Sequence, residues 1–296
     1  MDLAGPEIPQ EILDGLKAEN ERSRRYWTVK TFYPNIDEVF HGFRSGQLVG
    51  IGGNSAVGKS ALALNLAVSM AEHGTKVFLF SFEMTPNEVM IRLLNAATSM
   101  ELSMAGYKVA AAGCKSSSPD FAKKVEEMKA RIVREAKARL GSLPLEIIAE
   151  SSMTAEDIRL RAQCLLRNCD EAIIIIDCLQ LIQSSKELNR YENDDERLDS
   201  IVISLKQLAM GLSIPVIVVT HLNQTDDLSD ALPLAYHADI VMFLDPIKGN
   251  KELCEGWSFM EVRVAKFRQG PTGETLQLIY SPKLSTFLRL DGANFL

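Results

Sequence analysis

Short, almost wholly apolar runs alternate with helical stretches from Gln47 onward. Apolar runs without strict alternation are typical of parallel strands that helices cover on both faces. Strands that alternate with helices in this way form βαβ units. We therefore predict an α/β fold with a mostly parallel central sheet and helices on both faces. The predicted core strands are Leu48–Gly52, Val77–Phe82, Leu145–Ala149, Ala172–Asp177, Ile214–Thr220 and Ile240–Leu244.

The segments between the strands carry helix and loop signals. Ala61–Ala71 is apolar on almost every side, which predicts a buried helix after the first strand. Thr154 begins a capping-box pattern with Asp157 and so opens another helix. The small-residue segment Met104–Ser118 predicts a loop, which leads to a charged helix around Asp120–Leu140.

The two ends of the chain depart from this pattern. After Trp257 the positions alternate, break at Gly270–Gly273 and resume at Glu274–Tyr280, which predicts a C-terminal β-hairpin. Residues 1–30 carry a thin apolar stripe, so they are interpreted as an N-terminal arm. The arm is either an amphipathic helix that needs a partner surface or a frayed tail. Residues 31–296 are then one α/β domain.

Length, composition and charge limit the classes of protein. The chain has 296 residues, 46% hydrophobic and 24% charged, which suffices for one large domain with a complete core. The formal net charge is −7 and the sequence pI is about 5.3. This sign excludes a protein that coats nucleic acid over its whole surface, so a nucleic-acid site must be local.

Targeting signals and cysteine spacing indicate where the protein is located and what its cysteines do. The N-terminus lacks a signal-peptide pattern, and no apolar run approaches the roughly 18 residues that span a bilayer, so we expect a cytoplasmic protein without a membrane partner. The five cysteines are odd in number and lack CxxC or Cys/His metal spacing. This pattern argues against a disulfide framework and a zinc site, and favours structural thiols.

The most specific motif follows the first predicted strand and matches GxxxxGK[ST]. Its glycines allow a tight turn, its backbone N–H groups face an anion, and the following helix adds partial positive charge. Lys59 is expected at the β- and γ-phosphates, and the Ser60 hydroxyl at Mg²⁺. The motif predicts an ATP or GTP site; the alternative is an ordinary glycine-rich turn. The expected nucleotide-binding residues are Gly53, Asn54, Ser55, Ala56, Val57, Gly58, Lys59, Ser60 and Ala61.

Three polar side chains end or follow predicted strands at the same carboxyl edge of the sheet. Asp177 ends a run of four isoleucines and is the candidate carboxylate for Mg²⁺, or else a helix cap. Glu83 is the candidate general base for an attacking water, or else a helix-start carboxylate. His221 is placed to sense the γ-phosphate, or else is a polar strand end.

Five ordered segments resemble the successive motifs of DnaB-type replicative helicases. Their order and spacing agree from about Thr31 to Leu290. Phage primase-helicases are similar in placing a histidine at the position of His221, where bacterial members have a glutamine. The five segments are Gly53–Ser60, Phe80–Met84 with Arg92 downstream, Ile176–Leu181, Ser204–Ala209 and Ala265–Gly273.

The resemblance implies a RecA-like ATPase core that uses ATP and Mg²⁺ and assembles as a ring, usually of six subunits. In that family a KxR element reaches the neighbouring subunit's site, so Lys266 and Arg268 are expected to act there, with Arg268 as the arginine finger. A guanidinium suits the charge that develops on the transferred phosphoryl group. The alternative is that both charges merely face solvent beside a hairpin. The N-terminal arm would then be a linker helix that docks on a neighbour.

This sequence also departs from the family pattern. We find no helical collar domain and no primase domain, so the chain resembles the motor alone. In the expected DNA loop, Ser229 stands where arginine is usual and Leu232 where glycine is usual, while Asp226, Asp227 and Asp230 add negative charge. The other candidate channel loop, Ser184–Arg197, is also rich in acidic residues, and acidic loops oppose phosphate binding.

Three functional hypotheses follow. The first is an ATP-dependent ring helicase that translocates on single-stranded DNA and unwinds duplex during replication. The second is a RecA-like regulatory or scaffolding ATPase ring that acts on a protein partner. The third is a helicase subunit that obtains its primase or its collar or loader from another polypeptide.

Overall fold

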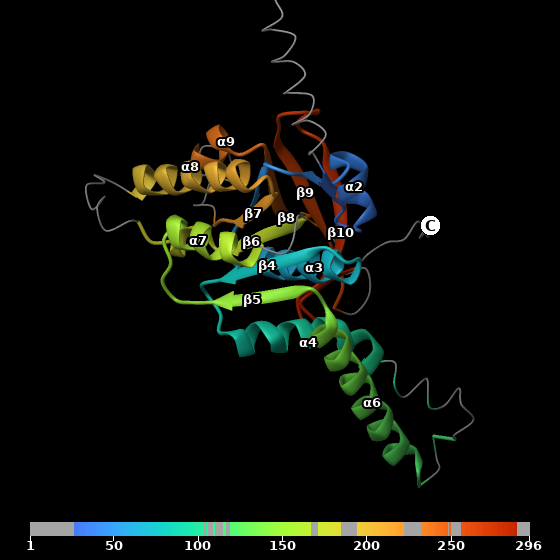
Figure 1. Ribbon diagram of the computed structural model, residues 1–296. Helices are drawn as coiled ribbons and strands as arrows, with labels where there is room; N and C mark the ends of the chain where they lie inside the picture. The colour runs from blue at the N-terminus through green and yellow to red at the C-terminus, as the bar shows by residue number, and fades with distance from the viewer. Residues whose placement is uncertain are drawn as a thin grey trace, which may run out of the picture.

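The computed structural model describes residues 27–103, 105, 109, 115–116, 119–166, 171–184, 194–221, 232–247, 249 and 256–288. Its centre is a nine-stranded sheet in the order β11-β10-β9-β8-β3-β7-β6-β4-β5 (Figure 1). The six strands from β8 to β5 are parallel, whereas β9, β10 and β11 pair antiparallel at one side. The predicted α/β fold with a mostly parallel sheet is confirmed.

The parallel strands follow the apolar runs of the sequence closely. Three of them, β3 (Leu48–Gly52), β5 (Leu145–Ala149) and β6 (Ala172–Asp177), have the predicted bounds. The ends of the other three differ from the predicted bounds by no more than two residues. They are β4 (Lys76–Ser81), β7 (Val216–Val219) and β8 (Ile240–Pro246).

The apolar runs are explained by two cores, one on each face of the sheet. In β6, Ile173 and Ile175 belong to one core, while Ile174 and Ile176 belong to the other. All four isoleucines have an exposed fraction of 0%. Helices cover both faces of the sheet, so neither face of this strand is exposed to solvent. Polar and apolar residues therefore do not alternate along it, as they do in a half-exposed strand.

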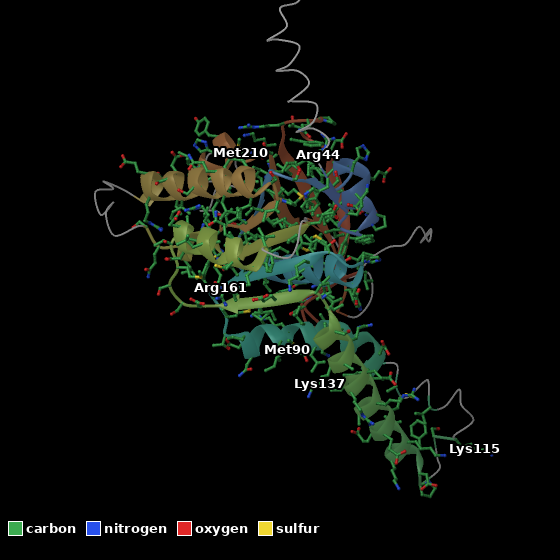
Figure 2. All side chains as sticks on the ribbon, in the orientation of Figure 1. Arg44, Met90, Lys115, Lys137, Arg161 and Met210 are labelled. Carbon is green, nitrogen blue, oxygen red and sulfur yellow. The ribbon has the colours of Figure 1, made fainter. Side chains whose placement is uncertain are left out.

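The helices divide between these two faces. The first core is covered by α2 (Pro34–Phe40), α3 (Lys59–Glu72), α4 (Pro86–Ser103) and α6 (Phe121–Ser142), and α6 projects beyond the sheet (Figure 1). The second is covered by α7 (Ala155–Leu165), the 3-10 turn η2 (Leu179–Leu181), α8 (Asp194–Leu212) and α9 (Leu232–His237). Met90 on α4 and Met210 on α8 lie on the outer surfaces of their helices, with exposed fractions of 42% and 61% (Figure 2).

The predicted helix signals hold in the structure, with one correction. Thr154 and Asp157 make both hydrogen bonds of the capping box at the start of α7. The loop expected from Met104 is wrong at its beginning, because Ala105 and Val109 are helical. Both are buried, with exposed fractions of 0% and 4%, so packing outweighs the small-residue composition of this segment.

The C-terminal hairpin is also present. It consists of β9 (Ser258–Phe267) and β10 (Thr275–Ser281), with the turn at Gly270–Gly273 between them. A third strand, β11 (Thr286–Leu288), adds to its edge. Two short strands, β1 (Thr28–Val29) and β2 (Phe43–Arg44), form a separate pair.

Several expectations concern residues outside the described ranges. They are the part of the N-terminal arm from residue 1 to 26, most of the acidic loop before α8, and the DNA loop residues Asp226, Asp227, Ser229 and Asp230. Leu232 begins α9. Across the described part of the chain, no helix has both the length and the apolar character needed to cross a membrane.

Candidate nucleotide-binding site

The GxxxxGK[ST] loop joins the carboxyl end of β3 to the start of α3. Gly53 has φ 153° and Gly58 has φ 102°, a backbone region that favours glycine. A Cβ atom on Gly53 would lie 2.6 Å from the backbone oxygen of Leu244, and one on Gly58 would lie 2.9 Å from the Tyr280 ring. Both glycines are therefore required by the conformation and by close packing.

The other loop residues surround this turn. Asn54, Ser55, Ala56 and Val57 form its outer part, and Ala56 has a positive φ of 63°. Ala61 lies in the first turn of α3 and is buried in the core, with an exposed fraction of 4%. Its side chain therefore packs inward, and only its backbone is near the start of the helix.

Lys59 is the first residue of α3 and is buried, with an exposed fraction of 4%. Its Nζ atom donates a hydrogen bond to the backbone oxygen of Asn54 at 2.6 Å. Burial lowers the pKa of Lys59, while the nearby Asp177, Cys178 and Glu83 oppose this shift. The ammonium group is thus held at the loop, beside the acidic side chains of the sheet edge.

Asp177 ends β6 and contacts the start of α3. The Ser60 hydroxyl donates a hydrogen bond to Oδ1 of Asp177 at 3.1 Å. The second oxygen, Oδ2, is buried and accepts no hydrogen bond from the described residues. Burial raises the pKa of Asp177 to about 6, and the charge of Glu83 adds to the rise.

The Ser60–Asp177 pair fits a divalent cation. An unpaired buried carboxylate oxygen is costly, and a cation beside it removes that cost. Hydroxyl and carboxylate oxygens are also the ligands that Mg²⁺ prefers. The residue types and the unpaired Oδ2 therefore suit Mg²⁺ at this position.

Glu83 and His221 meet at the same edge. Glu83 lies two residues beyond β4, His221 lies two residues beyond β7, and Oε1 of Glu83 is 3.8 Å from Nε2 of His221. Burial lowers the pKa of His221, and the charge of Lys59 lowers it further, which favours the neutral imidazole. As expected, the structure brings Lys59, Asp177, Glu83 and His221 together.

Gln180 fixes the position of His221, a role that the sequence did not reveal. Its side-chain Nε2 donates to Oγ1 of Thr220 at 2.8 Å, and its Oε1 accepts from the His221 backbone N–H at 3.3 Å. Gln180 belongs to η2, directly after β6, so these bonds connect the ends of β6 and β7. The only sequence signal was its place in a family motif.

Lys266 and Arg268 lie at the opposite edge of the sheet. Because β9 is antiparallel to β8, Phe267 pairs with Ile240, at the amino end of β8. Ile240 in turn pairs with Val49, four residues before Gly53, which is roughly 13 Å along the strands. The structure therefore does not bring these two side chains to the loop of their own chain.

Both basic side chains are held against α9 and the start of β8. Lys266 Nζ donates to the backbone oxygens of Ala235 at 2.7 Å and Tyr236 at 3.0 Å. The Arg268 guanidinium donates to the Tyr236 oxygen at 3.2 Å and lies 3.7 Å from Oδ1 of Asp239. Burial and the neighbouring Arg268 lower the pKa of Lys266.

Comparison with known proteins gives this geometry a context. The chain is 26% identical over 287 residues to the replicative DNA helicase DnaB of Leifsonia xyli subsp. xyli (strain CTCB07), covering 93% of this chain and 59% of that protein. It is 27% identical over 297 residues to the DnaB helicase of Geobacillus stearothermophilus, covering 96% of this chain and 62% of that protein. The chain thus spans less than two thirds of these relatives.

A solved structure and a family description agree with these relatives. The structure of a DnaB-like replicative helicase matches with a TM-score of 0.73 at 23% identity, covering 97% of this chain and 68% of that one. At this identity the likeness shows the fold alone, which is RecA-like. The family described as DnaB-like helicase C terminal domain matches residues 28–289. Since that match covers nearly the whole chain, the protein belongs to the DnaB-like helicase C-terminal domain family.

Proposed function

We propose that this chain is the motor of an ATP-dependent ring helicase, which acts in the cytoplasm, translocates on single-stranded DNA and unwinds duplex during replication. The observation that carries this proposal is the convergence of Lys59, Asp177, Glu83 and His221 at one sheet edge, while Arg268 lies at the other. Such a site holds what nucleotide binding and water activation need, and lacks one charge that a neighbour can supply. Membership of the helicase family supports this reading.

In this proposal the loop from Gly53 to Ala61 binds ATP. Its backbone N–H groups and Lys59 hold the phosphates, while Ser60 and Asp177 hold Mg²⁺. When bound, Mg²⁺ neutralises charge on the phosphoryl oxygens. Without nucleotide, Nζ of Lys59 donates a hydrogen bond to the Asn54 backbone oxygen at 2.6 Å. When ATP binds, Nζ exchanges this partner for the phosphate oxygens.

Glu83 and His221 act on the reacting groups. Glu83 accepts the proton of the attacking water, since its carboxylate has a side-chain exposed fraction of 46% and faces the open edge. His221 is neutral because of burial and Lys59, so its ring N–H can donate to the γ-phosphate, or a ring nitrogen can accept from water. Gln180 keeps the imidazole at this edge through the His221 backbone.

Arg268 and Lys266 complete the site of an adjacent copy. Neither reaches its own loop, and Arg268 keeps a side-chain exposed fraction of 49% that a neighbour can contact. A head-to-tail contact of this kind generates a ring when its rotation closes. We propose a closed homo-oligomer, a hexamer by family resemblance, with one site between each pair of neighbours.

The test of the proposal is the ATPase rate with and without single-stranded DNA, measured alongside unwinding of a forked duplex. We expect ATPase activity that single-stranded DNA stimulates, and unwinding that requires ATP. Lys59→Ala is the matched control and should abolish both. Wild-type protein without ATPase activity at any protein concentration contradicts the proposal.

A second candidate is a regulatory or scaffolding ATPase ring that acts on a protein partner. The net charge of −7 and the acidic segments before α8 and α9 favour it, because phosphate binding depends mostly on lysine and arginine. A salt titration of single-strand binding separates the two. A helicase loses affinity steeply as salt rises, whereas no binding even at low salt favours the protein partner.

A separate primase, collar or loader protein is a further proposed partner. The chain spans 59% and 62% of two DnaB relatives, so those proteins contain segments that this sequence does not cover. Co-purification from the native source tests the proposal. A polypeptide with primase activity that co-elutes with this chain supports it, and elution of this chain alone opposes it.

A further inference from the structure

Three different metal-binding side chains converge beside the phosphate loop. One ligand atom each from Glu83, Cys178 and His221 lies within 4.8 Å of the other two. Oε1 of Glu83 and Nε2 of His221 are 3.8 Å apart. The residues follow the carboxyl ends of β4, β6 and β7, so the parallel sheet itself gathers them.

The combination of carboxylate, thiol and imidazole is typical of zinc. A tetrahedral Zn²⁺ ion has bonds of about 2.0–2.3 Å, which places its ligand atoms roughly 3.3–3.8 Å apart. An oxygen and a nitrogen ligand lie at the short end of this range, so the 3.8 Å between Glu83 and His221 must contract by roughly 0.3–0.5 Å. The remaining distances need a contraction of about 1 Å at most by this geometry, which rotation of the part-exposed Glu83 and His221 side chains provides.

The exposure of the three residues gives the cluster an inner and an outer side. Cys178 is buried, with an exposed fraction of 1%, and forms the floor. The side chains of Glu83 and His221 have exposed fractions of 46% and 35% and form the rim. An ion enters from the rim and keeps an open fourth position, as zinc sites with three protein ligands do.

This cluster differs in chemistry from the Ser60–Asp177 pair. Ser60 and Asp177 offer only oxygen atoms, which Mg²⁺ prefers. Glu83, Cys178 and His221 offer oxygen, sulfur and nitrogen, which favour Zn²⁺ over Mg²⁺. Two features oppose a cation here: the ammonium of Lys59, whose charge the carboxylates of Asp177 and Glu83 offset, and the thiol of Cys178, whose pKa is raised to about 11 by burial and by the same carboxylates.

We propose that Glu83, Cys178 and His221 form a second metal site, which binds Zn²⁺ and inhibits ATP hydrolysis. Binding releases the Cys178 thiol proton to solvent, because the thiolate is the ligand. A coordinated Glu83 carboxylate no longer accepts a proton from water. The inhibition therefore rests on the proposed role of Glu83, whereas the metal site does not.

Cobalt absorption tests the site without any measurement of activity. Co²⁺ takes the place of Zn²⁺, and a thiolate ligand gives it a sulfur-to-cobalt charge-transfer band in the near ultraviolet. We expect this band in the wild type and in Cys164→Ser, since Cys164 is an exposed thiol on α7. We expect its loss in Cys178→Ser and affinity weakened by roughly tenfold or more in His221→Gln. No band in the wild type, or an equal band in Cys178→Ser, overturns the proposal.

The Zn²⁺ dependence of the ATPase rate tests the proposed inhibition. Melting curves of the metal-free variants check that each variant is folded. The Zn²⁺ concentration for half-inhibition should rise by roughly tenfold or more in Cys178→Ser, each variant being compared with its own zinc-free rate. Cys164→Ser should keep the wild-type value. Cobalt binding without zinc inhibition supports the metal site and contradicts Glu83 as the base. Equal inhibition of the wild type and Cys178→Ser overturns the inhibitory role.

Discussion

The Nζ atom of Lys206 lies 2.6 Å from Oδ2 of Asp239, in a part-buried ion pair between α8 and the residue before β8. The same carboxylate oxygen accepts a hydrogen bond from the Leu48 backbone N–H at 2.8 Å. The backbone oxygen of Asp239 accepts from the Arg268 N–H at 2.9 Å. One residue therefore connects α8, β3 and the end of β9 that carries Arg268.

Loss of the Lys206 cation is predicted to destabilise the fold. In Lys206→Met, Asp239 keeps its buried carboxylate without its main counter-charge, which costs about 3 kcal/mol in free energy of unfolding. Urea denaturation measures this change. Lys129→Met is the matched control, because Lys129 pairs with Glu126 at the surface of α6 and should change stability by less than about 0.5 kcal/mol. Equal effects of the two substitutions contradict the prediction.

The raised pKa of Asp177 predicts a pH-dependent stability. The pKa is about 6 in the folded chain against an ordinary value of 3.8. Between these values the folded chain holds a proton that the unfolded chain releases, so the contribution of this group to stability is greatest below about pH 4 and is lost as the pH rises through about 6. Without nucleotide and Mg²⁺, this group lowers stability at pH 7 by roughly 3 kcal/mol.

Asp177→Asn removes this titration. The free energy of unfolding of the variant, minus that of the wild type, should rise by roughly 2.5 kcal/mol between about pH 4 and pH 7. Denaturation across this pH range in metal-free buffer measures the difference. Glu126→Gln, at the surface of α6, should show no comparable rise. A flat difference for Asp177→Asn would show that burial does not shift this carboxyl group.

Glu83→Gln separates binding from hydrolysis. The substitution keeps the size of the side chain and removes the proton acceptor, so the ATPase rate should fall by about 10²–10⁴-fold. ATP affinity should stay close to wild type, because Glu83 lies outside the Gly53–Ala61 loop. Single-turnover hydrolysis and nucleotide binding measure the two quantities. Glu135→Gln on the surface of α6 is the control, and a wild-type rate in Glu83→Gln rules out Glu83 as the base.

The sequence predicted most of the sheet because burial on both faces leaves an unbroken apolar run in each parallel strand. It missed α2, α9, β1, β2 and β11, which are short and depend on contacts across the chain. Tyr33, just before α2, donates its hydroxyl to the Phe287 oxygen of β11 at 3.2 Å, although 254 residues separate them. Such contacts have no local signal.

Some residues of the candidate site were likewise predictable from the sequence, and others were not. Asp177, Glu83 and His221 were predictable as neighbours, because each ends or follows a parallel strand and carboxyl ends share one edge. Gln180 and the Lys206–Asp239 pair were not, since their partners are distant in sequence. The cysteine spacing argued against zinc, yet Cys178 lies beside Glu83 and His221 because three separate strands place them together.

Mixing two inactive variants tests the shared site most directly. The Arg268→Ala chain keeps an intact phosphate loop, and the Lys59→Ala chain keeps Arg268. A shared site is therefore intact only where an Arg268→Ala chain contributes the loop and a neighbouring Lys59→Ala chain contributes Arg268. Random mixing in equal amounts should restore about a quarter of the sites in a ring. A Lys59→Ala chain mixed with a Lys59→Ala, Arg268→Ala chain is the matched control and should restore none. We predict ATPase activity near a quarter of wild type in the first mixture, and activity no greater than in the control contradicts a site completed by Arg268 of a neighbour.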